Sequence, residues 1–414
     1  MARTAAALLL AALAALAETP RTAARAERDA AVWPNRWTGS NRHGAYRPVW
    51  DAEKATWPDV RRTKDDRGLQ GVCLGARHAA AFRQCSSTHV FVGVLSAAAN
   101  AERRAAVRQT WASAASRGDD ARRRGRAGKP RVDVRFFVMV DKAHAESLRR
   151  EAKQHGDVVL LHWQRESYFG IANKTLAILE YGATWPGATH VFKTDDDTYV
   201  DLPRLVRSVL RCGDVGRRSS KAHAPGEYLI GYLEPPGGTP KRGSDAWDIP
   251  YEDVPDDRLP AWPHGALYGV TVAVARSIAA DKDVRTAMKL EDIGAAMWIK
   301  AAAERLPGGV ELCHDPAFNF KGCDEDRAAL RPTATSSSGA RQSRDLAAHW
   351  VGPCLMFCMH ETRRCCPEYL ARVKGECTMH SWDATALRWR ARTPASTWAE
   401  QGVEGAEYIQ RADV

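Results

Sequence analysis

Residues 192–200 read FKTDDDTYV, which sets three consecutive aspartates directly after a short hydrophobic segment. The segment 189–193 predicts a buried strand, because it is short and apolar. Side chains alternate between the two faces of an extended backbone, so Asp195 and Asp197 are expected to point one way and Asp196 the other. A hard divalent cation such as Mg²⁺ or Mn²⁺ neutralises clustered carboxylates through their oxygen atoms. We interpret the stretch as a metal–diphosphate site, with a solvated acidic turn as the alternative.

Strands and helices are predicted to alternate on both sides of this stretch. The predicted strands are 89–95, 134–140, 158–162, 189–193 and 266–275, and the predicted helices are 101–115, 143–155, 171–182 and 202–212. This alternation indicates an α/β fold with a mainly parallel central sheet. Ligands of such sheets gather at the carboxyl ends of the strands, where the aspartates lie. Residues 213–263 are rich in Pro, Gly and aromatic residues and predict a long, loop-rich region of a size to hold an acceptor.

The composition is that of a folded protein with a basic balance. Hydrophobic residues make up 44% of the 414 residues and charged residues 27%, which excludes a wholly disordered chain. The net charge of +10 suits an anionic partner, which is a nucleic acid, a membrane surface or a phosphate-bearing small molecule. The Arg- and Gly-rich segment 117–131 is interpreted as a solvated surface loop rather than a nucleic-acid patch.

The N-terminus indicates entry into the secretory pathway. Residues 5–17 are an unbroken run of Ala and Leu. This run is shorter than the roughly 20 residues of a spanning helix and matches the apolar region of a signal peptide, with a small-residue cleavage site at 15–17. The alternative is an uncleaved signal-anchor, which would make a type II protein of the Golgi membrane. Either reading places the remaining chain in a secretory lumen.

The ten cysteines agree with a lumenal compartment, because an even number of cysteines in a secreted chain favours disulfides. The alternative is a zinc cluster. Its candidate ligands are Cys354, Cys358, His360, Cys365 and Cys366.

Basic residues upstream of the aspartates are candidates for binding phosphates. Arg104 and Arg108 are four residues apart on a predicted helix, so they are expected to share one face and to bridge phosphates or a base. Lys174 lies at the predicted start of a helix, where backbone N–H groups favour an anion.

Six blocks of sequence, in order, resemble glycosyltransferase family 31, the inverting β-1,3-galactosyl- and N-acetylglucosaminyltransferases. They include RAAVRQTW at 104–111, the opening stretch at 192–200 and the Glu-Asp-Ile block at 291–293. The other three blocks are 166–175, 247–268 and 349–356. Together the six blocks cover about residues 91–356.

The resemblance implies a GT-A type nucleotide-sugar-binding fold, a UDP-sugar donor and Mn²⁺. It implies Asp197 as the main metal carboxylate, His349 as a second ligand and Asp195 shared between metal and donor. Asp292 is implied as the general base that deprotonates the acceptor hydroxyl, with Glu291 as the fallback. The residues expected at the donor are Arg104, Arg108, Lys174, Asp195 and Asp196.

The implied activity is transfer of galactose or N-acetylglucosamine to a hydroxyl of a glycan or glycoprotein acceptor, forming a β-1,3-type linkage. One alternative is a catalytically silent sugar- or nucleotide-binding protein on the same fold. A nucleic-acid binder is disfavoured by the apolar N-terminus and the cysteines. We expect a signal peptide or signal-anchor at 1–20, a stem at 21–85, the GT-A domain at 86–362 and a Cys- and Trp-containing tail at 363–414.

Overall fold

The computed structural model describes the central part of the chain and two short segments near its end. The described residues are 73, 84–115, 129–162, 170–219, 226–243, 247–281, 288–318, 347–362, 380–383 and 388–391. The predicted signal or anchor at 1–20, nearly all of the stem, most of the loop at 117–131 and residues 166–169 lie outside this set. Within the described residues, none of the helices has the length and apolar character needed to cross a membrane.

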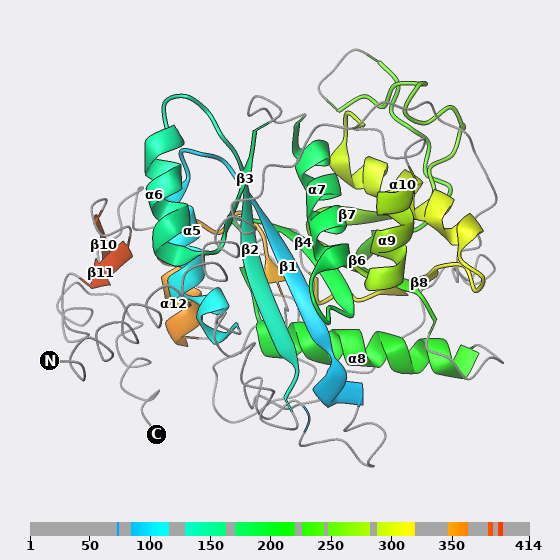
Figure 1. The fold of residues 1–414 in the computed structure, drawn as a ribbon. Coiled ribbons are helices and arrows are strands. Elements are labelled where there is room, and N and C mark those ends of the chain that lie inside the picture. Colours follow the sequence, from blue (N-terminus) through cyan, green and yellow to red (C-terminus); the bar gives the residue numbers. More distant parts are fainter. Residues whose placement is uncertain are drawn as a thin grey trace, which may run out of the picture.

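A seven-stranded sheet forms the centre of the molecule, in the order β3-β2-β1-β4-β7-β6-β8 (Figure 1). Its strands are β1 (His89–Ser96), β2 (Arg131–Met139), β3 (Val158–Leu161), β4 (His190–Asp195), β6 (Tyr228–Glu234), β7 (Trp262–Thr271) and β8 (Glu311–His314). Strand β7 pairs antiparallel with β4 and β6, and the other neighbouring pairs are parallel. The predicted α/β fold with a mainly parallel sheet is confirmed.

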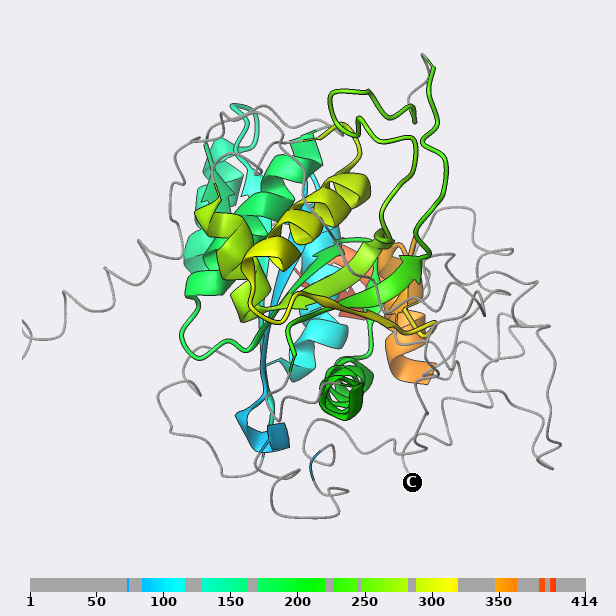
Figure 2. The same ribbon diagram turned by 90° about the vertical axis from the view of Figure 1, so that its right-hand side faces the viewer.

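Helices cover both faces of the sheet (Figures 1 and 2). The helices are α5 (Ala101–Gln109), α6 (Ala145–His155), α7 (Ile171–Thr184), α8 (Leu202–Ser219), α9 (Val272–Ala280), α10 (Glu291–Arg305) and α12 (Pro353–Thr362), with a 3-10 turn at Trp111–Ala114. One hydrophobic core joins the sheet to α7, α9 and α10, and a second joins it to α5, α8 and α12. Near the end of the chain, β10 (His380–Asp383) and β11 (Arg388–Ala391) form a separate hairpin.

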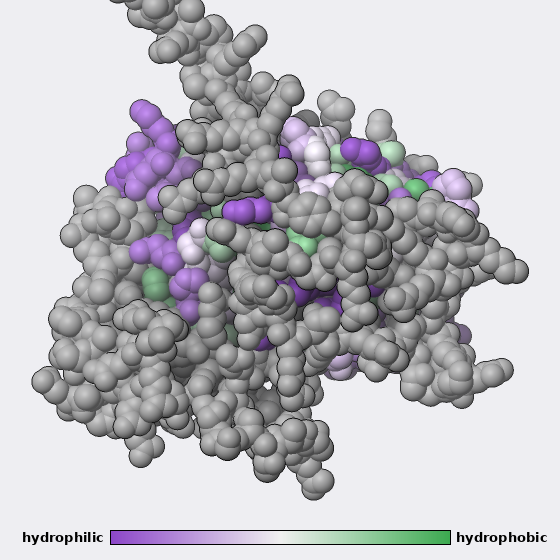
Figure 3. Space-filling model, turned by 90° about the horizontal axis from the view of Figure 1, so that it is seen from below, coloured by the Kyte–Doolittle hydropathy of each residue, from purple (hydrophilic) through white to green (hydrophobic). Residues whose placement is uncertain are grey.

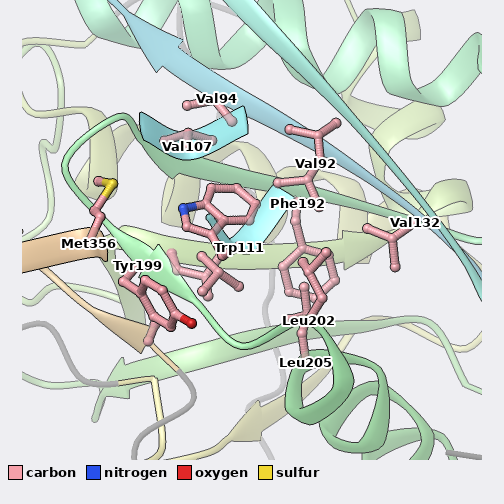
Figure 4. Packing of buried hydrophobic residues seen from close by; sticks show 14 of the residues in the cluster. Val92, Val94, Val107, Trp111, Val132, Phe192, Tyr199, Leu202, Leu205 and Met356 are labelled. Carbon is pink, nitrogen blue, oxygen red and sulfur yellow. The ribbon is translucent and has the colours of Figure 1, made fainter. Parts of the chain in front are cut away.

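The opening stretch is held by buried residues on both sides of its aspartates. Phe192 in β4 is fully buried, and Tyr199 lies in the same core together with Trp111 and Met356 (Figure 4). Tyr199 and Val200 form β5 (Tyr199–Val200), which pairs with β9 (Ala347–Ala348). Burying a large apolar side chain stabilises a fold by about 1.5–3 kcal/mol. These anchors hold the turn between them at the carboxyl end of β4.

Gly269 of β7 explains how closely β4 and β7 are packed. It lies opposite Phe192 in the strand pairing, and a Cβ atom at position 269 would be 2.5 Å from the Phe192 ring. A side chain there would displace the ring, so glycine is required although it weakens strands in general. The ring of Phe192 therefore lies directly against the backbone of the neighbouring strand.

Two predicted segments differ from the structure. The region 213–263, expected to be loop-rich, contains the end of α8 and the whole of β6. Tyr228, Leu229 and Ile230 are buried in β6, but this apolar run is short. The glycine and prolines that follow it have the composition of a loop, so the sequence did not predict a strand here. The strand expected at 266–275 begins at Trp262 and ends at Thr271, after which the chain turns into α9. Packing of α9 against α7 overrides the β-propensity of its valines.

Two disulfides are present among the described residues. Cys73 is bonded to Cys85, and Cys212 of α8 is bonded to Cys313 of β8. The prediction of disulfides is confirmed for these four cysteines. The side chains of Cys354, Cys358, Cys365 and Cys366 lie outside the described set, and so does the zinc alternative.

Removing the Cys212–Cys313 bond is expected to lower the free energy of unfolding by about 2–5 kcal/mol, because the bond closes a long loop in the unfolded chain. Its cysteines are 101 residues apart, against 12 for Cys73–Cys85. The paired substitution Cys212→Ala/Cys313→Ala is compared with Cys73→Ala/Cys85→Ala by urea denaturation. A larger loss from the shorter loop would contradict this expectation.

Candidate active site

Three side chains at the carboxyl edge of the sheet form a candidate metal centre. One ligand atom each from Asp195, Asp197 and His349 lies within 4.8 Å of the others. The Nε2 atom of His349 is 3.6 Å from Oδ2 of Asp195 and 3.4 Å from Oδ1 of Asp197. The β5–β9 pairing brings His349 to this place, and the backbone N–H of Val351 donates to the carbonyl of Asp197 (2.7 Å). Two carboxylates and an imidazole are suited to a divalent ion such as Mn²⁺ or Mg²⁺.

The two carboxylates of this centre differ in their surroundings. Burial works against the charge of Asp197, but His349 and Arg103 outweigh it and hold the pKa of Asp197 below its ordinary value. Burial raises the pKa of Asp195, more than the neighbouring Lys193 and His349 lower it. Asp197 is therefore the more readily ionised of the two.

Asp196 makes its contacts outside this centre, although the extended backbone expected here ends at Asp195 and Asp196 and Asp197 lie in the turn after β4. Asp196 is buried and accepts hydrogen bonds from Ser96 Oγ (2.7 Å) and Asn100 Nδ2 (2.9 Å). Its other oxygen is 3.1 Å from Nη1 of Arg103. These contacts join the turn after β4 to the connection between β1 and α5. Asp196 has the contacts of a residue that shapes the site, and its predicted donor contact stays a prediction.

Arg104 and Arg108 are held in an internal ion-pair network. The guanidinium of Arg104 is fully buried and donates to both oxygens of Glu151 on α6 (2.9 and 2.7 Å). Arg108 pairs with Asp157 (2.7 Å) and with Glu151 (2.7 Å) and lies over the ring of Phe136. A donor contact by either arginine would require such a pair to open, because a guanidinium donates in a fixed planar fork. Their predicted role at the donor stays a prediction.

Lys174 lies closer to the aspartates. It is buried in the first turns of α7, and its Nζ donates to the backbone carbonyl of Ser96 (2.9 Å). The side chain of Ser96 in turn donates to Asp196. Lys174 thus supports the end of β1 beside the site.

Arg103 and Lys193 were not predicted from the sequence. Nη1 of Arg103 is 3.1 Å from Asp196 and 3.3 Å from Asp197, and the side chain is 40% exposed. A half-exposed guanidinium beside the carboxylates is suited to a diphosphate. Its neighbour Arg104 and Arg108 have the four-residue spacing that predicts a shared helix face, and Arg103 lacks such a partner in the sequence. Lys193 had a visible signal, since it is a cation inside an apolar strand.

Glu291 and Asp292 open α10 at the same edge of the sheet. Glu291 is buried and accepts hydrogen bonds from Thr175 Oγ1 (2.8 Å) and Tyr268 OH (2.5 Å). Asp292 is half-buried, and one of its oxygens accepts the N–H of Ile293 (2.9 Å). Burial and then the charge of Glu291 raise the pKa of Asp292 to about 6. A carboxylate with this pKa can take up a proton near neutral pH.

Trp350 is an exposed aromatic residue next to the candidate metal centre. Its side chain is 66% exposed, and its ring stacks on that of His349 at 4.8 Å between centroids. Its φ of 56° lies in the left-handed region, which costs a residue with a Cβ atom free energy. The strained turn lets His349 face the carboxylates while Val351 bonds to Asp197.

Replacing Trp350 with glycine is expected to raise the free energy of unfolding by about 1 kcal/mol, because glycine adopts positive φ without the Cβ clash. Trp350→Ala is the control, since it removes the ring and keeps the Cβ atom. Thermal and urea denaturation of both variants measure the difference. Equal stability of the two variants would count against backbone strain at this position.

Further aromatic residues lie on the connection between β6 and β7 and at the start of β7. Trp247 and Tyr251, on the connection between β6 and β7, are 55% and 61% exposed. Trp262 at the start of β7 lies against His264, with ring centroids 4.7 Å apart. On the face seen from below, the described residues at the surface are mainly hydrophilic, with hydrophobic ones between them (Figure 3). The guanidinium of Arg242 lies over the ring of Tyr251 at 3.9 Å from its centroid, so one face of this ring is already covered.

The mainly parallel sheet carries a carboxylate–imidazole centre and a second pair of carboxylates at its carboxyl edge, an arrangement consistent with a GT-A-like α/β fold. The galactosyltransferase family model matches residues 102–303. This match and the galactosyltransferase relatives confirm the resemblance to glycosyltransferase family 31 found in the six sequence blocks.

Known galactosyltransferases are similar to this chain over more than half of its length. Beta-1,3-galactosyltransferase GALT1 of Arabidopsis thaliana is 32% identical over 67% of this chain and 39% of its own. Hydroxyproline O-galactosyltransferase GALT5 of the same plant is 30% identical over 57% of this chain and 32% of its own. Beta-1,3-galactosyltransferase 6 of Mus musculus is 27% identical over 59% of this chain and 69% of its own. The chain thus spans two fifths or less of these two plant relatives.

Proposed function

We propose that this protein is an inverting galactosyltransferase that uses a UDP-sugar and Mn²⁺ and forms a β-1,3-type linkage. The observation that carries the proposal is the pairing of two groups at one edge of the sheet. One is the Asp195–Asp197–His349 centre, and the other is Asp292 at the start of α10, with its pKa raised to about 6. Family membership and the names of the relatives support galactose as the transferred sugar.

The donor side is assigned to the centre and to Arg103. A divalent ion held by Asp195, Asp197 and His349 would supply charge stabilisation for the leaving diphosphate. Arg103 lies 3.3 Å from Asp197 and is exposed enough to contact a phosphate oxygen. Its guanidinium would bind that oxygen through charge-assisted hydrogen bonds.

The acceptor side is assigned to Asp292. Its carboxylate takes the proton of the acceptor hydroxyl while that oxygen bonds to the anomeric carbon and the bond from this carbon to the diphosphate breaks. Attack from the side opposite the leaving group converts an α-linked donor into a β-linked product. Glu291 is less suited to the role, because it is buried and already accepts hydrogen bonds from Thr175 and Tyr268. Asp292 is half-buried, and the hydrogen bond that its carboxylate accepts comes from the backbone N–H of Ile293.

The direct test is a donor-by-acceptor screen with linkage analysis of the product. UDP-galactose and UDP-N-acetylglucosamine are offered with Mn²⁺, and the acceptors include β-galactosides, N-acetylglucosaminides and hydroxyproline-containing peptides. We expect UDP release that depends on acceptor and stops with a chelator. Tight UDP binding without transfer to any acceptor would instead favour a catalytically silent binding protein.

The compartment is proposed as the lumen of the secretory pathway, with the Golgi as the specific site. The two disulfides support a lumenal location. Membrane association is proposed through residues 1–20 if this segment is not cleaved. Fractionation of the full-length protein, with carbonate extraction of the membranes, tests the attachment.

The transfer rate is expected to fall as pH drops through about 6, because Asp292 must be ionised to accept a proton and its pKa is about 6. Replacing Glu291 with glutamine removes the neighbouring negative charge, so the midpoint of this decline should move to lower pH. The measurement is kcat against pH at saturating donor and acceptor. A midpoint that stays in place in Glu291→Gln would argue against Asp292 as the titrating base.

A further inference from the structure

Lys193 is a buried cation between the two halves of the site. Its side chain is 1% exposed, and Nζ is 2.9 Å from Oδ1 of Asp195 and 3.4 Å from Oε2 of Glu291. It also donates to the backbone carbonyl of Gly265 in β7. An ammonium group has three N–H donors, and these three oxygens come from three different elements of the fold. A single side chain thus joins β4, β7 and α10.

On the base side, the ion pair between Lys193 and Glu291 fixes the start of α10. Glu291 is the first residue of that helix and Asp292 the second. Thr175 of α7 and Tyr268 of β7 hold the other oxygen of Glu291. The carboxylate is therefore restrained by α7, β4 and β7 together, and the neighbouring Asp292 moves with it.

On the donor side, the ion pair between Lys193 and Asp195 gives the two oxygens of Asp195 different partners. Oδ1 lies against Lys193, whereas Oδ2 faces Nε2 of His349 at 3.6 Å. Turning the carboxylate out of this orientation would weaken its ion pair with a buried cation and its approach to His349 at the same time. Lys193 therefore fixes the orientation of the Asp195 carboxylate plane relative to the candidate metal centre.

We propose that Lys193 is a positioning residue that ties Asp195 to the first turn of α10 and so sets the spacing between the donor and the base Asp292. This inference rests on the proposed function and deepens it. A misplacement of about 1 Å in a reacting pair can lower a rate by about 10²-fold. Lys193 acts through its neighbours and does not itself take part in bond making or breaking.

The test compares transfer with hydrolysis of the donor by water, which does not require an acceptor hydroxyl placed against Asp292. In Lys193→Met the ratio of transfer to hydrolysis should fall by about 10²-fold. The midpoint of the pH decline should rise, because the charge of Lys193 no longer favours ionised Asp292. Lys300→Met is the matched control, since Lys300 also joins α10 to an aspartate, Asp256 (3.3 Å). Lys300→Met should keep the wild-type ratio of transfer to hydrolysis and the wild-type midpoint of the pH decline.

A second variant guards against misfolding. Lys193→Met/Glu291→Gln removes the cation together with one of its anionic partners, so it should be better folded than Lys193→Met by circular dichroism and keep the low transfer-to-hydrolysis ratio. A wild-type ratio in the folded double variant would overturn the positioning role. A wild-type protein that neither transfers nor hydrolyses a UDP-sugar would overturn the proposed function instead.

Discussion

Asp292→Asn should lower kcat for sugar transfer by about 10²–10⁴-fold, because the amide cannot accept the proton of the acceptor hydroxyl. The substitution keeps the shape of the side chain and removes its charge. The binding of UDP and Mn²⁺ should stay within a few-fold of wild type, since Asp292 lies on the acceptor side. Single-turnover transfer at saturating donor and acceptor isolates the chemical step.

Glu304→Gln is the matched control for Asp292→Asn. Glu304 is an exposed acidic residue near the far end of α10, so the same change of chemistry is made on the same helix. We expect wild-type kcat in this variant. A kcat for Asp292→Asn within a factor of three of wild type would remove Asp292 from the mechanism, and Glu291→Gln would then be measured as the remaining carboxylate.

Asp197→Ala should lower kcat/KM by about 10³-fold or more, because a divalent ion contributes several kcal/mol of stabilisation to developing charge. Asp197 faces His349 at 3.4 Å, and its pKa is held below the ordinary value, so it is ionised at neutral pH. The direct measurement is Mn²⁺ binding in the presence of UDP, by electron paramagnetic resonance. We expect the affinity for Mn²⁺ to fall in parallel with the activity.

Asp196→Asn is the comparison for Asp197→Ala. Asp196 holds Ser96, Asn100 and Arg103, so its replacement should destabilise the fold by about 1–3 kcal/mol. Its effect on Mn²⁺ affinity should be much smaller than that of Asp197→Ala. Unchanged Mn²⁺ binding in Asp197→Ala, or an equal loss in both variants, would contradict the assignment of the centre.

Local patterns were enough to predict the alternating strands and helices of the fold, because buried strands such as β1 and β4 are short apolar runs. The opposed placement of Asp196 was predicted from an extended backbone, whereas the turn that follows β4 sets it. Strand β6 was not predicted, because Gly231 and the prolines after it have the composition of a loop. The valines of α9 indicated a strand, and their burial against α7 decided otherwise.

The candidate site residues could be predicted where they lie in the family's sequence blocks. They could be predicted less well where contacts with residues far away in the sequence determine the role of a side chain. The closeness of His349 to Asp195 depends on the pairing of β5 with β9. The internal roles of Arg104 and Arg108 depend on Glu151 and Asp157, which no spacing rule connects to them. Charge patterns identify candidate cations, and only tertiary contacts separate those held inside from those facing a ligand.

The pairing of β5 with β9 also sets the smallest fragment that could work. A fragment ending at residue 303, where the family match stops, would lack His349 and β8. It would also lose Phe318, whose ring stacks on Phe192 at 6.4 Å, and Met356 in the same core. Such a fragment should be insoluble when expressed alone, whereas one spanning residues 73–391 keeps the site, both disulfides and the packing of β11 against α5. Expression of both fragments and comparison of their soluble yields test this expectation.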